Sequence, residues 1–165
     1  MTSTDDLRAY LANQSPEDAA ANAHWLDDAP VLKPAGVWAN LDANDNPVYL
    51  NVTLYGEQSK SWNTYYAGVH HTKRSKEAKR AHGLVVAKLA GCGVQFTSQV
   101  DIKVAVYRGN LRRFDSDNVV DKFYIDGLVQ AGVLIDDSYQ YVRWAASAIF
   151  IDKDNPRVVI EVTTV

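Results

Sequence analysis

Apolar and polar residues alternate along much of the chain, which is typical of strands that bury one face. The clearest example lies within residues 94–108, where every second residue from Val100 to Val106 is apolar. The turn-rich segment 43–47 predicts two consecutive strands or a hairpin around it, and the turn at 154–156 predicts a hairpin between the last two strands. Runs of β-branched and aromatic residues place these other strands at 37–42, 48–55, 141–151 and 158–162.

Two longer segments have a helical period instead. Ser75 can cap a helix over residues 75–90, in which apolar residues recur on one face. A second helix is predicted from Asp117 or Asn118 to residue 131, and Gly132 suits the left-handed position that follows a helix end.

The remaining segments complete the expected organisation. Residues 56–72 are polar and aromatic without a regular period, which predicts a long loop. The first 30 residues predict two short helices, the second opened by Ser15 and Pro16. The order of elements predicts an α+β domain over residues 46–165, a mixed sheet packed against two main helices, with a short extension of unknown role over residues 1–45.

Composition narrows the class of protein. Apolar residues make up 47% and charged residues 22% of the chain, as in ordinary globular domains. The acidic start and the lack of a long apolar run predict a cytoplasmic protein without a membrane segment. Cys92 is the only cysteine, which excludes an intramolecular disulfide and a cysteine-based zinc cluster.

The net charge of −3 is distributed unevenly along the chain. Residues 1–45 hold eight acids and two bases, whereas residues 46–165 hold twelve acids and fifteen bases. The two parts therefore carry −6 and +3. Because phosphate binding depends on local charge, the basic part remains compatible with a nucleic-acid partner.

The strongest chemical signal is a concentration of acids around the second predicted helix. Asp115 and Asp117 lie where this helix is expected to start, and Asp136 and Asp137 follow it. Carboxylates this close repel one another unless they share a cation, and Mg²⁺ prefers such ligands together with water and phosphate oxygens. The pattern predicts a phosphodiesterase site. The alternative interpretation is a helix cap at Asp117 or Asn118 and a solvated turn at the later pair.

Basic and polar residues flank these acids. Arg112 and Arg113 come directly before them and are expected to hold the DNA backbone. Asn118, Lys122 and Asp126 are spaced four residues apart and predict one polar stripe along the helix. Lys122 is expected to offer positive charge to the phosphate, and Asp126 to orient this lysine or a metal-bound water.

The order of motifs around the acids resembles that of a known family. A D-x-D-N motif stands at 115–118, followed by D-G-L at 126–128, A-G-V at 131–133 and D-D-S at 136–138. This arrangement resembles the RusA family of Holliday junction resolvases. A weaker similarity extends upstream, where residues 61–66, Ser-Trp-Asn-Thr-Tyr-Tyr, resemble the family's S-x-N-x-Y-Y-like loop.

The resemblance implies a fold and an activity. It implies a homodimeric α+β nuclease with a RusA-like mixed sheet, dependent on Mg²⁺ with Mn²⁺ as a substitute, in a bacterial or phage-infected cell. Such an enzyme nicks opposite strands of a four-way DNA junction symmetrically during recombination and repair. The metal-binding catalytic acids would be Asp115, Asp117 and Asp137, the catalytic lysine Lys122, and the supporting residues Asn118, Asp126 and Asp136. Expected DNA contacts are Arg112, Arg113, Lys73, Arg74, Lys76, Lys79, Arg80, Asn63 and Tyr66.

One departure from the family pattern concerns the lysine. Family members place it four residues after the second aspartate, where this chain has Asp121, and Lys122 comes one residue later. In a helix that starts at 117 or 118, a π-bulge would return Lys122 to the family position, whereas a regular helix would turn it by about 100°.

Several residues leave alternatives open. The basic run 73–80 fits contact with DNA phosphates, and also a solvated helix face. Trp62, Tyr65 and Tyr66 fit stacking on unpaired bases, and also core packing. Two other functions fit the same chain: a catalytically inactive protein that binds branched DNA on this fold, and a flap or fork endonuclease.

Overall fold

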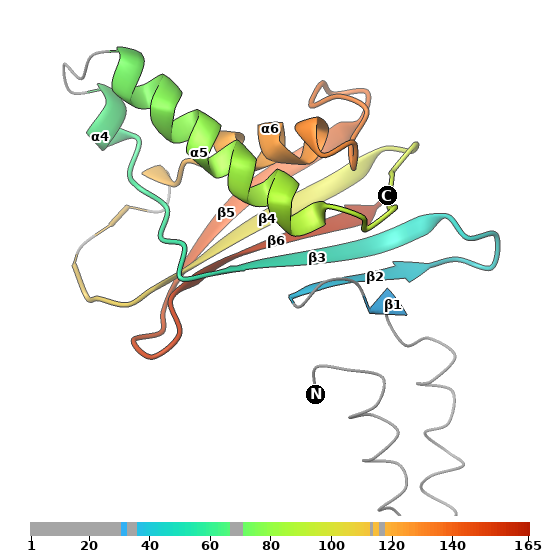
Figure 1. Ribbon diagram of the computed structural model, residues 1–165, viewed down its shortest axis with the longest axis horizontal. Coiled ribbons are helices and arrows are strands. Elements are labelled where there is room, and N and C mark those ends of the chain that lie inside the picture. The colour runs from blue at the N-terminus through green and yellow to red at the C-terminus, as the bar shows by residue number, and fades with distance from the viewer. Residues whose placement is uncertain (1–30, 33–35, 67–70, 113, 116–117) are drawn as a thin grey trace, which may run out of the picture.

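The computed structural model describes residues 31–32, 36–66, 71–112, 114–115 and 118–165, which form an α+β fold with six strands in one mixed sheet (Figure 1). The two short helices predicted within residues 1–30 lie outside the described residues. The strands are β1 (Val31–Leu32), β2 (Val37–Leu41), β3 (Pro47–Tyr55), β4 (Val100–Arg108), β5 (Val142–Ile151) and β6 (Arg157–Thr164).

The sheet has the order β1-β2-β3-β6-β4-β5, in which only β4 and β5 run parallel. The two strands predicted around residues 43–47 are confirmed, and of the two alternatives for them the structure has the hairpin, because β2 and β3 pair antiparallel. Asp42 closes this turn, since its side chain accepts the backbone N–H groups of Asn44 and Asn46. Because β2 pairs with β3, the sheet extends into the part of the chain before residue 45.

The predicted hairpin between the last two strands is wrong. β4 lies between β5 and β6, so residues 152–156 carry the chain past the end of β4. Val158, Ile160 and Val162 are each 0% exposed and belong to the hydrophobic core, and β6 pairs antiparallel with β3 on one side and β4 on the other. β6 therefore takes a central position, and β5, with exposed Trp144 and Phe150, takes the edge.

Three helices are described: α4 (Asn63–Tyr66), α5 (His71–Leu89) and α6 (Lys122–Gln130). α4 lies inside the predicted long loop, and α5 begins four residues before Ser75, so the predicted loop is too long and the predicted helix too short. α6 ends as expected, with Gly132 at φ 74° after the Ala131 C-cap.

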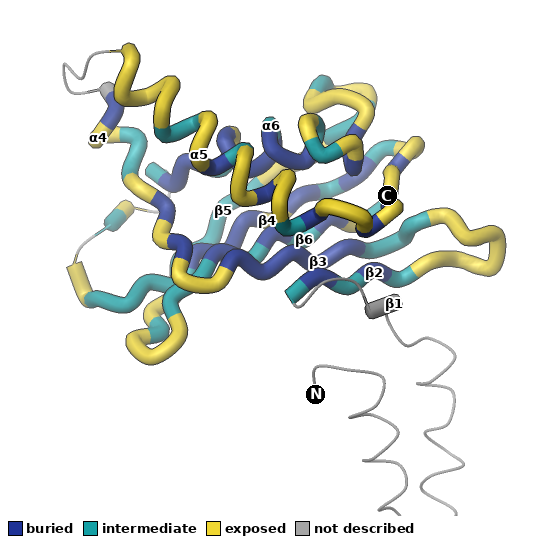
Figure 2. The backbone as a smooth tube through the Cα atoms, viewed as in Figure 1, coloured by how far each residue is buried: buried dark blue, intermediate teal, exposed yellow. Residues whose placement is uncertain are grey.

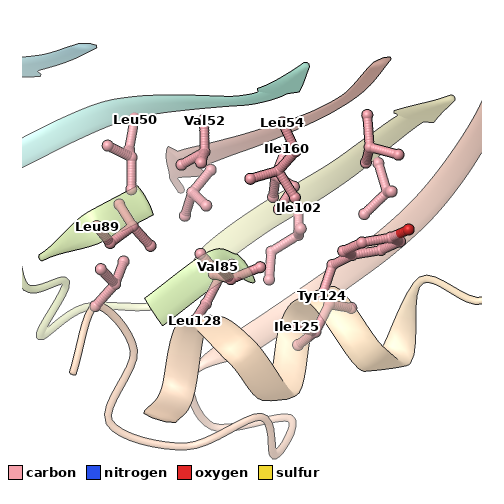
Figure 3. Close-up of a cluster of buried hydrophobic side chains, with 14 of the residues drawn as sticks. Leu50, Val52, Leu54, Val85, Leu89, Ile102, Tyr124, Ile125, Leu128 and Ile160 are labelled. Atoms are coloured by element: carbon pink, nitrogen blue, oxygen red, sulfur yellow. The ribbon is translucent and has the colours of Figure 1, made fainter. Parts of the chain in front are cut away.

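The core lies between the sheet and the pair α5 and α6, which cover one face of the sheet (Figures 1 and 2). Ala81, Val85 and Leu89 form the buried face of α5, as the sequence predicts. Leu128 of α6 is 0% exposed and packs in the same layer (Figure 3). Apolar residues of the sheet complete the core, among them Leu50, Val52, Leu54, Ile102 and Ile160.

Candidate functional site

The start of α6 differs from the prediction in a way that bears on the site. The helix begins at Lys122, with Asp121 as its N-cap, rather than at residue 117 or 118. Residues before it pair with the loop 57–62: Trp62 N–H donates to Asn118 O at 2.9 Å, and Ser61 and Val119 form an antiparallel bridge. Because these backbone groups are engaged with the loop, they are not free to make helical hydrogen bonds.

Side chains hold the same segment in place. Val119 and Val120 are both 2% exposed, and neighbouring residues that are both buried are easier to accommodate in an irregular segment than on one face of a helix. Val120 N–H donates to Ser59 Oγ at 3.4 Å. Asp121 accepts the Ser147 hydroxyl at 3.0 Å, which fixes the helix start to β5.

This helix start removes the question of a π-bulge. Both geometries predicted for Lys122 depend on a helix that starts at residue 117 or 118, and this start is wrong because α6 begins at Lys122 itself. The position that the family fills with lysine is here the helix cap Asp121.

Lys122, Asp126 and Asp137 form one cluster, referred to below as the Lys122 cluster. Lys122 Nζ lies 2.9 Å from Asp126 Oδ1 and 2.9 Å from Asp137 Oδ2. The hydrogen bonds to Asp126 and then Asp137 raise the pKa of Lys122, and the hydrogen bond from Lys122 lowers the pKa of Asp137. The lysine is therefore cationic and Asp137 anionic at neutral pH. The structure thus brings three of the predicted site residues together.

The remaining predicted acids have different surroundings. Asp136 forms a turn, because its Oδ1 accepts the backbone N–H groups of Asp137 at 2.6 Å and Ser138 at 3.3 Å. The main-chain oxygen of Asp115 accepts the Asn118 N–H at 3.0 Å in the segment that leads to α6. Asp117 and Arg113 lie outside the described residues.

His82 is a neighbour of the cluster that sequence reasoning did not single out as a site residue. Its Nε2 lies 3.7 Å from Asp126 Oδ2, and its Nδ1 lies 2.8 Å from Gln130 Nε2. His82 belongs to α5, whereas Asp126 and Gln130 belong to α6, so these contacts connect the two helices next to the Lys122 cluster. The sequence placed His82 beside the basic run of α5, and only the packing of α5 against α6 brings it to Asp126.

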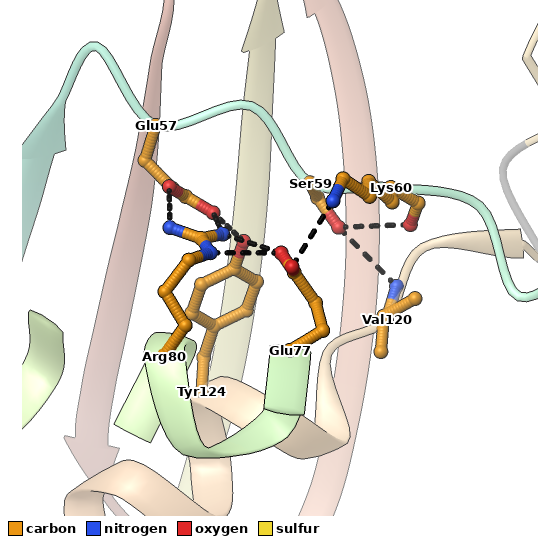
Figure 4. Close-up of polar contacts among 7 residues, drawn as sticks. All are labelled: Glu57, Ser59, Lys60, Glu77, Arg80, Val120 and Tyr124. Atoms are coloured by element: carbon orange, nitrogen blue, oxygen red, sulfur yellow. Dashed lines mark hydrogen bonds and ion pairs between the residues drawn. The ribbon is translucent and has the colours of Figure 1, made fainter. Parts of the chain in front are cut away.

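A second network anchors the loop 57–62 (Figure 4). Glu57 is 7% exposed, and both of its carboxylate oxygens accept hydrogen bonds from Arg80, at 2.8 and 2.6 Å. Glu57 also accepts the Tyr124 hydroxyl at 3.0 Å, and Arg80 bonds Glu77 at 2.6 Å. Lys60 bonds Glu77 at 3.0 Å. These five residues are referred to below as the Glu57 clamp, and they tie the loop to α5 and α6.

The clamp changes the interpretation of Arg80. Its guanidinium donates hydrogen bonds to the carboxylates of Glu57 and Glu77, and these bonds raise its pKa further above the ordinary value. A charge-assisted bidentate pair of this kind fixes geometry. Arg80 was predicted as a DNA contact, and in the structure it holds the loop that supports residues 118–120. The pattern of the sequence gave no signal for its partner Glu57.

The other predicted DNA contacts lie on several surfaces. Lys73, Arg74, Lys76 and Lys79 are exposed on α5, Asn63 is exposed on α4, and Arg112 is exposed after β4. The Tyr66 side chain lies outside the described residues.

Aromatic packing accounts for two of the residues considered for base stacking. Trp62 and Phe123 have ring centroids 5.5 Å apart, and Tyr65 and Phe123 5.8 Å apart. Tyr65 is 7% exposed. Of the two alternatives, base stacking and core packing, the structure shows core packing for Trp62 and Tyr65.

The oxygen donors of the predicted site decide which metal it could hold. Within the ranges that the structure describes, no three His, Cys, Asp or Glu side chains gather closely enough to hold a metal ion, and these ranges do not contain Asp117. The described acids Asp115 and Asp137 offer carboxylate oxygens, which are the ligands that Mg²⁺ prefers. In their chemistry these two carboxylates suit a hard cation such as Mg²⁺.

Comparison with known proteins adds no family assignment: no family model matches the sequence, and no curated protein matches it. Among the described helices, none has the length and apolar character needed to cross a membrane.

Proposed function

We propose that this protein is a Mg²⁺-dependent endonuclease that cuts branched DNA at four-way junctions, and that it acts as a homodimer with a RusA-like fold. The observation that carries the proposal is the Lys122 cluster. The cationic Lys122, the first residue of α6, follows the segment with the D-x-D-N motif, and it pairs with the anionic Asp137, which comes after the end of the helix.

The acids have a defined role in this proposal. Asp115, Asp117 and Asp137 would hold the cation through carboxylate oxygens, with Asn118 and Asp136 supporting the two segments. When bound, Mg²⁺ would lower the pKa of a coordinated water and neutralise charge on the scissile phosphate. Asp137 suits this task because Lys122 keeps its carboxyl ionised, and because its side chain is 38% exposed.

Lys122 would stabilise charge on the phosphate. Its side chain is 58% exposed, so a non-bridging phosphate oxygen can approach the ammonium from solvent. Asp126 holds the lysine from one turn further along α6, and the hydrogen bond at 2.9 Å limits the directions that the ammonium can take. A pre-positioned cation of this kind stabilises the transition state without reorganisation.

The test is cleavage of a synthetic four-way junction in the presence of Mg²⁺. The wild-type protein should make paired symmetric nicks, and Mn²⁺ should replace Mg²⁺. Asp115→Asn and Asp137→Asn should each lower the cleavage rate by at least about 100-fold, since each removes a charged ligand. Asp45→Asn is the matched control, because Asp45 lies in the β2–β3 turn at φ 62°, which asparagine adopts readily.

Three other outcomes of this experiment would change or contradict the proposal. Binding of the junction without cleavage in either metal would identify a catalytically inactive DNA-binding protein. Faster cleavage of flaps or forks than of junctions would assign the chemistry to those substrates. Undiminished cleavage by both aspartate variants would contradict the proposed site.

A further inference from the structure

A pocket separate from the Lys122 cluster lies between the loop 57–62, α4 and the first turns of α5. Its volume is about 430 Å³, and Thr64, Tyr65, Lys73 and Lys76 line it together with Lys60, Glu77 and Arg80 of the Glu57 clamp. This volume falls in the range of pockets that take small organic ligands. It is referred to below as the α5 pocket.

The charges around the α5 pocket favour an anion. Lys60 and Arg80 are already paired with Glu77, and Arg80 also with Glu57 (Figure 4). Lys73 and Lys76 are exposed, and neither makes an ion pair with any residue in the described ranges. Both lie near the N-terminal end of α5, where the helix dipole adds positive potential. Two lysine charges therefore remain for a ligand.

Tyr65 supplies a second observation that points to a ligand. It is 7% exposed, and its hydroxyl is closed off from solvent and has no hydrogen-bond partner among the described residues, so the pocket wall must shift for a ligand to reach it. A buried hydroxyl without a partner is costly and uncommon in folded proteins. Burial raises the pKa of Tyr65 to about 12, so the hydroxyl keeps its proton and remains a donor at neutral pH.

We infer that the α5 pocket binds one nucleotide unit of a DNA strand, with its phosphate on Lys73 and Lys76 and a hydrogen bond from the Tyr65 hydroxyl. The volume suits a sugar and base together with the phosphate, because a phosphate alone would leave most of the pocket empty. Thr64 adds a hydroxyl that can donate or accept a hydrogen bond at the pocket wall. The inference rests on the proposed function for its choice of DNA as the ligand.

The first measurement uses amide NMR of the full chain with EDTA, titrated with thymidine 5′-monophosphate, thymidine or inorganic phosphate. The monophosphate should shift the amides of Thr64, Tyr65, Lys73 and Lys76 at the lowest concentration. Equal binding of inorganic phosphate would overturn the nucleotide assignment. Equal binding of polyglutamate would assign the pocket to an acidic polypeptide and would also overturn it.

The second measurement compares two double variants that each remove two positive charges from the protein. Lys73→Ala with Lys76→Ala should weaken monophosphate binding at least about tenfold, since charge-assisted hydrogen bonds are lost. Lys88→Ala with Lys153→Ala removes the same charge from residues that do not line the α5 pocket, and should change the affinity less than about twofold. Equal losses in the two double variants would mean general attraction and overturn the inference.

A third variant tests the hydroxyl. Tyr65→Phe keeps the ring that packs against Phe123 and should leave the melting temperature unchanged or slightly higher, while it weakens monophosphate binding. Unchanged binding would remove Tyr65 from the site.

These measurements fail separately from the proposed function, because they are made without a divalent metal and involve no cleavage. Nucleotide binding in a protein that cuts no branched DNA would keep the α5 pocket and reject the nuclease. Junction cleavage with no nucleotide binding would keep the nuclease and reject the α5 pocket as a nucleotide site.

Discussion

Glu57 is a single buried acid that holds the loop 57–62 in place, and this loop in turn supports the segment that leads to the candidate site. Its carboxylate is covered by protein and is compensated by Arg80 and Tyr124. A buried charge of this kind contributes little net stability while it is paired, but it is costly once a partner is removed. The loop 57–62, and through it residues 118–120, depends on this pairing.

Arg80→Met should lower the free energy of unfolding by about 3 kcal/mol, because it leaves the Glu57 carboxylate buried with only Tyr124 as a partner. Lys79→Met, on the same helix and exposed, should change it by less than about 0.5 kcal/mol. Urea unfolding at neutral pH measures both values. Equal effects of the two variants would show that the clamp is not needed for the fold.

The effect of Arg80→Met should also depend on pH. Burial acts to raise the pKa of Glu77, but the hydrogen bonds from Arg80 and Lys60 outweigh it, and the pKa lies below the ordinary 4.5. A carboxyl whose pKa is lowered by folding stabilises the protein above its unfolded pKa and loses that contribution as the pH falls through the folded pKa. The stability difference between wild type and Arg80→Met should therefore be full above pH 4.5 and shrink below it. A difference that is constant with pH would contradict this account.

At the scale of the elements, the contact between α5 and α6 is set by one glycine. A Cβ added at Gly127 would lie 2.8 Å from Val85 Cβ, closer than real side chains approach. The absence of a side chain lets the two helices come together, and this contact brings His82 of α5 to Asp126 of α6. The position of the Lys122 cluster therefore depends on helix packing as well as on the helix start.

Gly127→Ala should lower the free energy of unfolding by about 1 to 2 kcal/mol, since overpacking against Val85 outweighs the gain in helix propensity. Gly83→Ala provides the opposite case, because a Cβ at Gly83 meets nothing within 4 Å. It should stabilise the protein by about 0.5 to 1 kcal/mol. Thermal unfolding of the two variants compares them directly. Stabilisation by Gly127→Ala would mean that the helices do not touch at this point.

At the scale of the whole molecule, the uneven charge of the chain predicts how the proposed DNA binding should depend on salt. The first 30 residues carry six acids and one base, whereas residues 46–165 are net positive. Negative charge tethered to a DNA-binding domain lowers its affinity for phosphate through a field that salt screens.

Neutralising these acids in the full chain should raise the affinity for a four-way junction several-fold at about 50 mM salt and have little effect at about 300 mM, where the Debye length is much shorter. Fluorescence anisotropy with a labelled junction measures both conditions. A variant that binds like the wild type at low salt would remove any electrostatic role of the segment. The six exchanges are Asp5→Asn, Asp6→Asn, Glu17→Gln, Asp18→Asn, Asp27→Asn and Asp28→Asn.

The sequence by itself determined the α+β class, the two strands on either side of the turn at 43–47, the buried face of α5 and the end of α6. These features depend on local chemistry: side-chain alternation, turn residues, helical period and the left-handed freedom of Gly132. The spacing of Lys122 and Asp126 by one helical turn is local in the same sense, and their ion pair follows from it.

Only the tertiary structure decided the order of the strands, the start of α6, and the partners of Arg80, Asp137 and His82. Each of these depends on contacts between residues far apart in the chain. β6 lies at the centre of the sheet because it buries one face completely, and residues 118–120 stay out of the helix because the loop 57–62 takes their backbone groups. A sequence pattern describes what a segment can do, whereas competition among segments for buried positions and hydrogen-bond partners decides which of these possibilities forms.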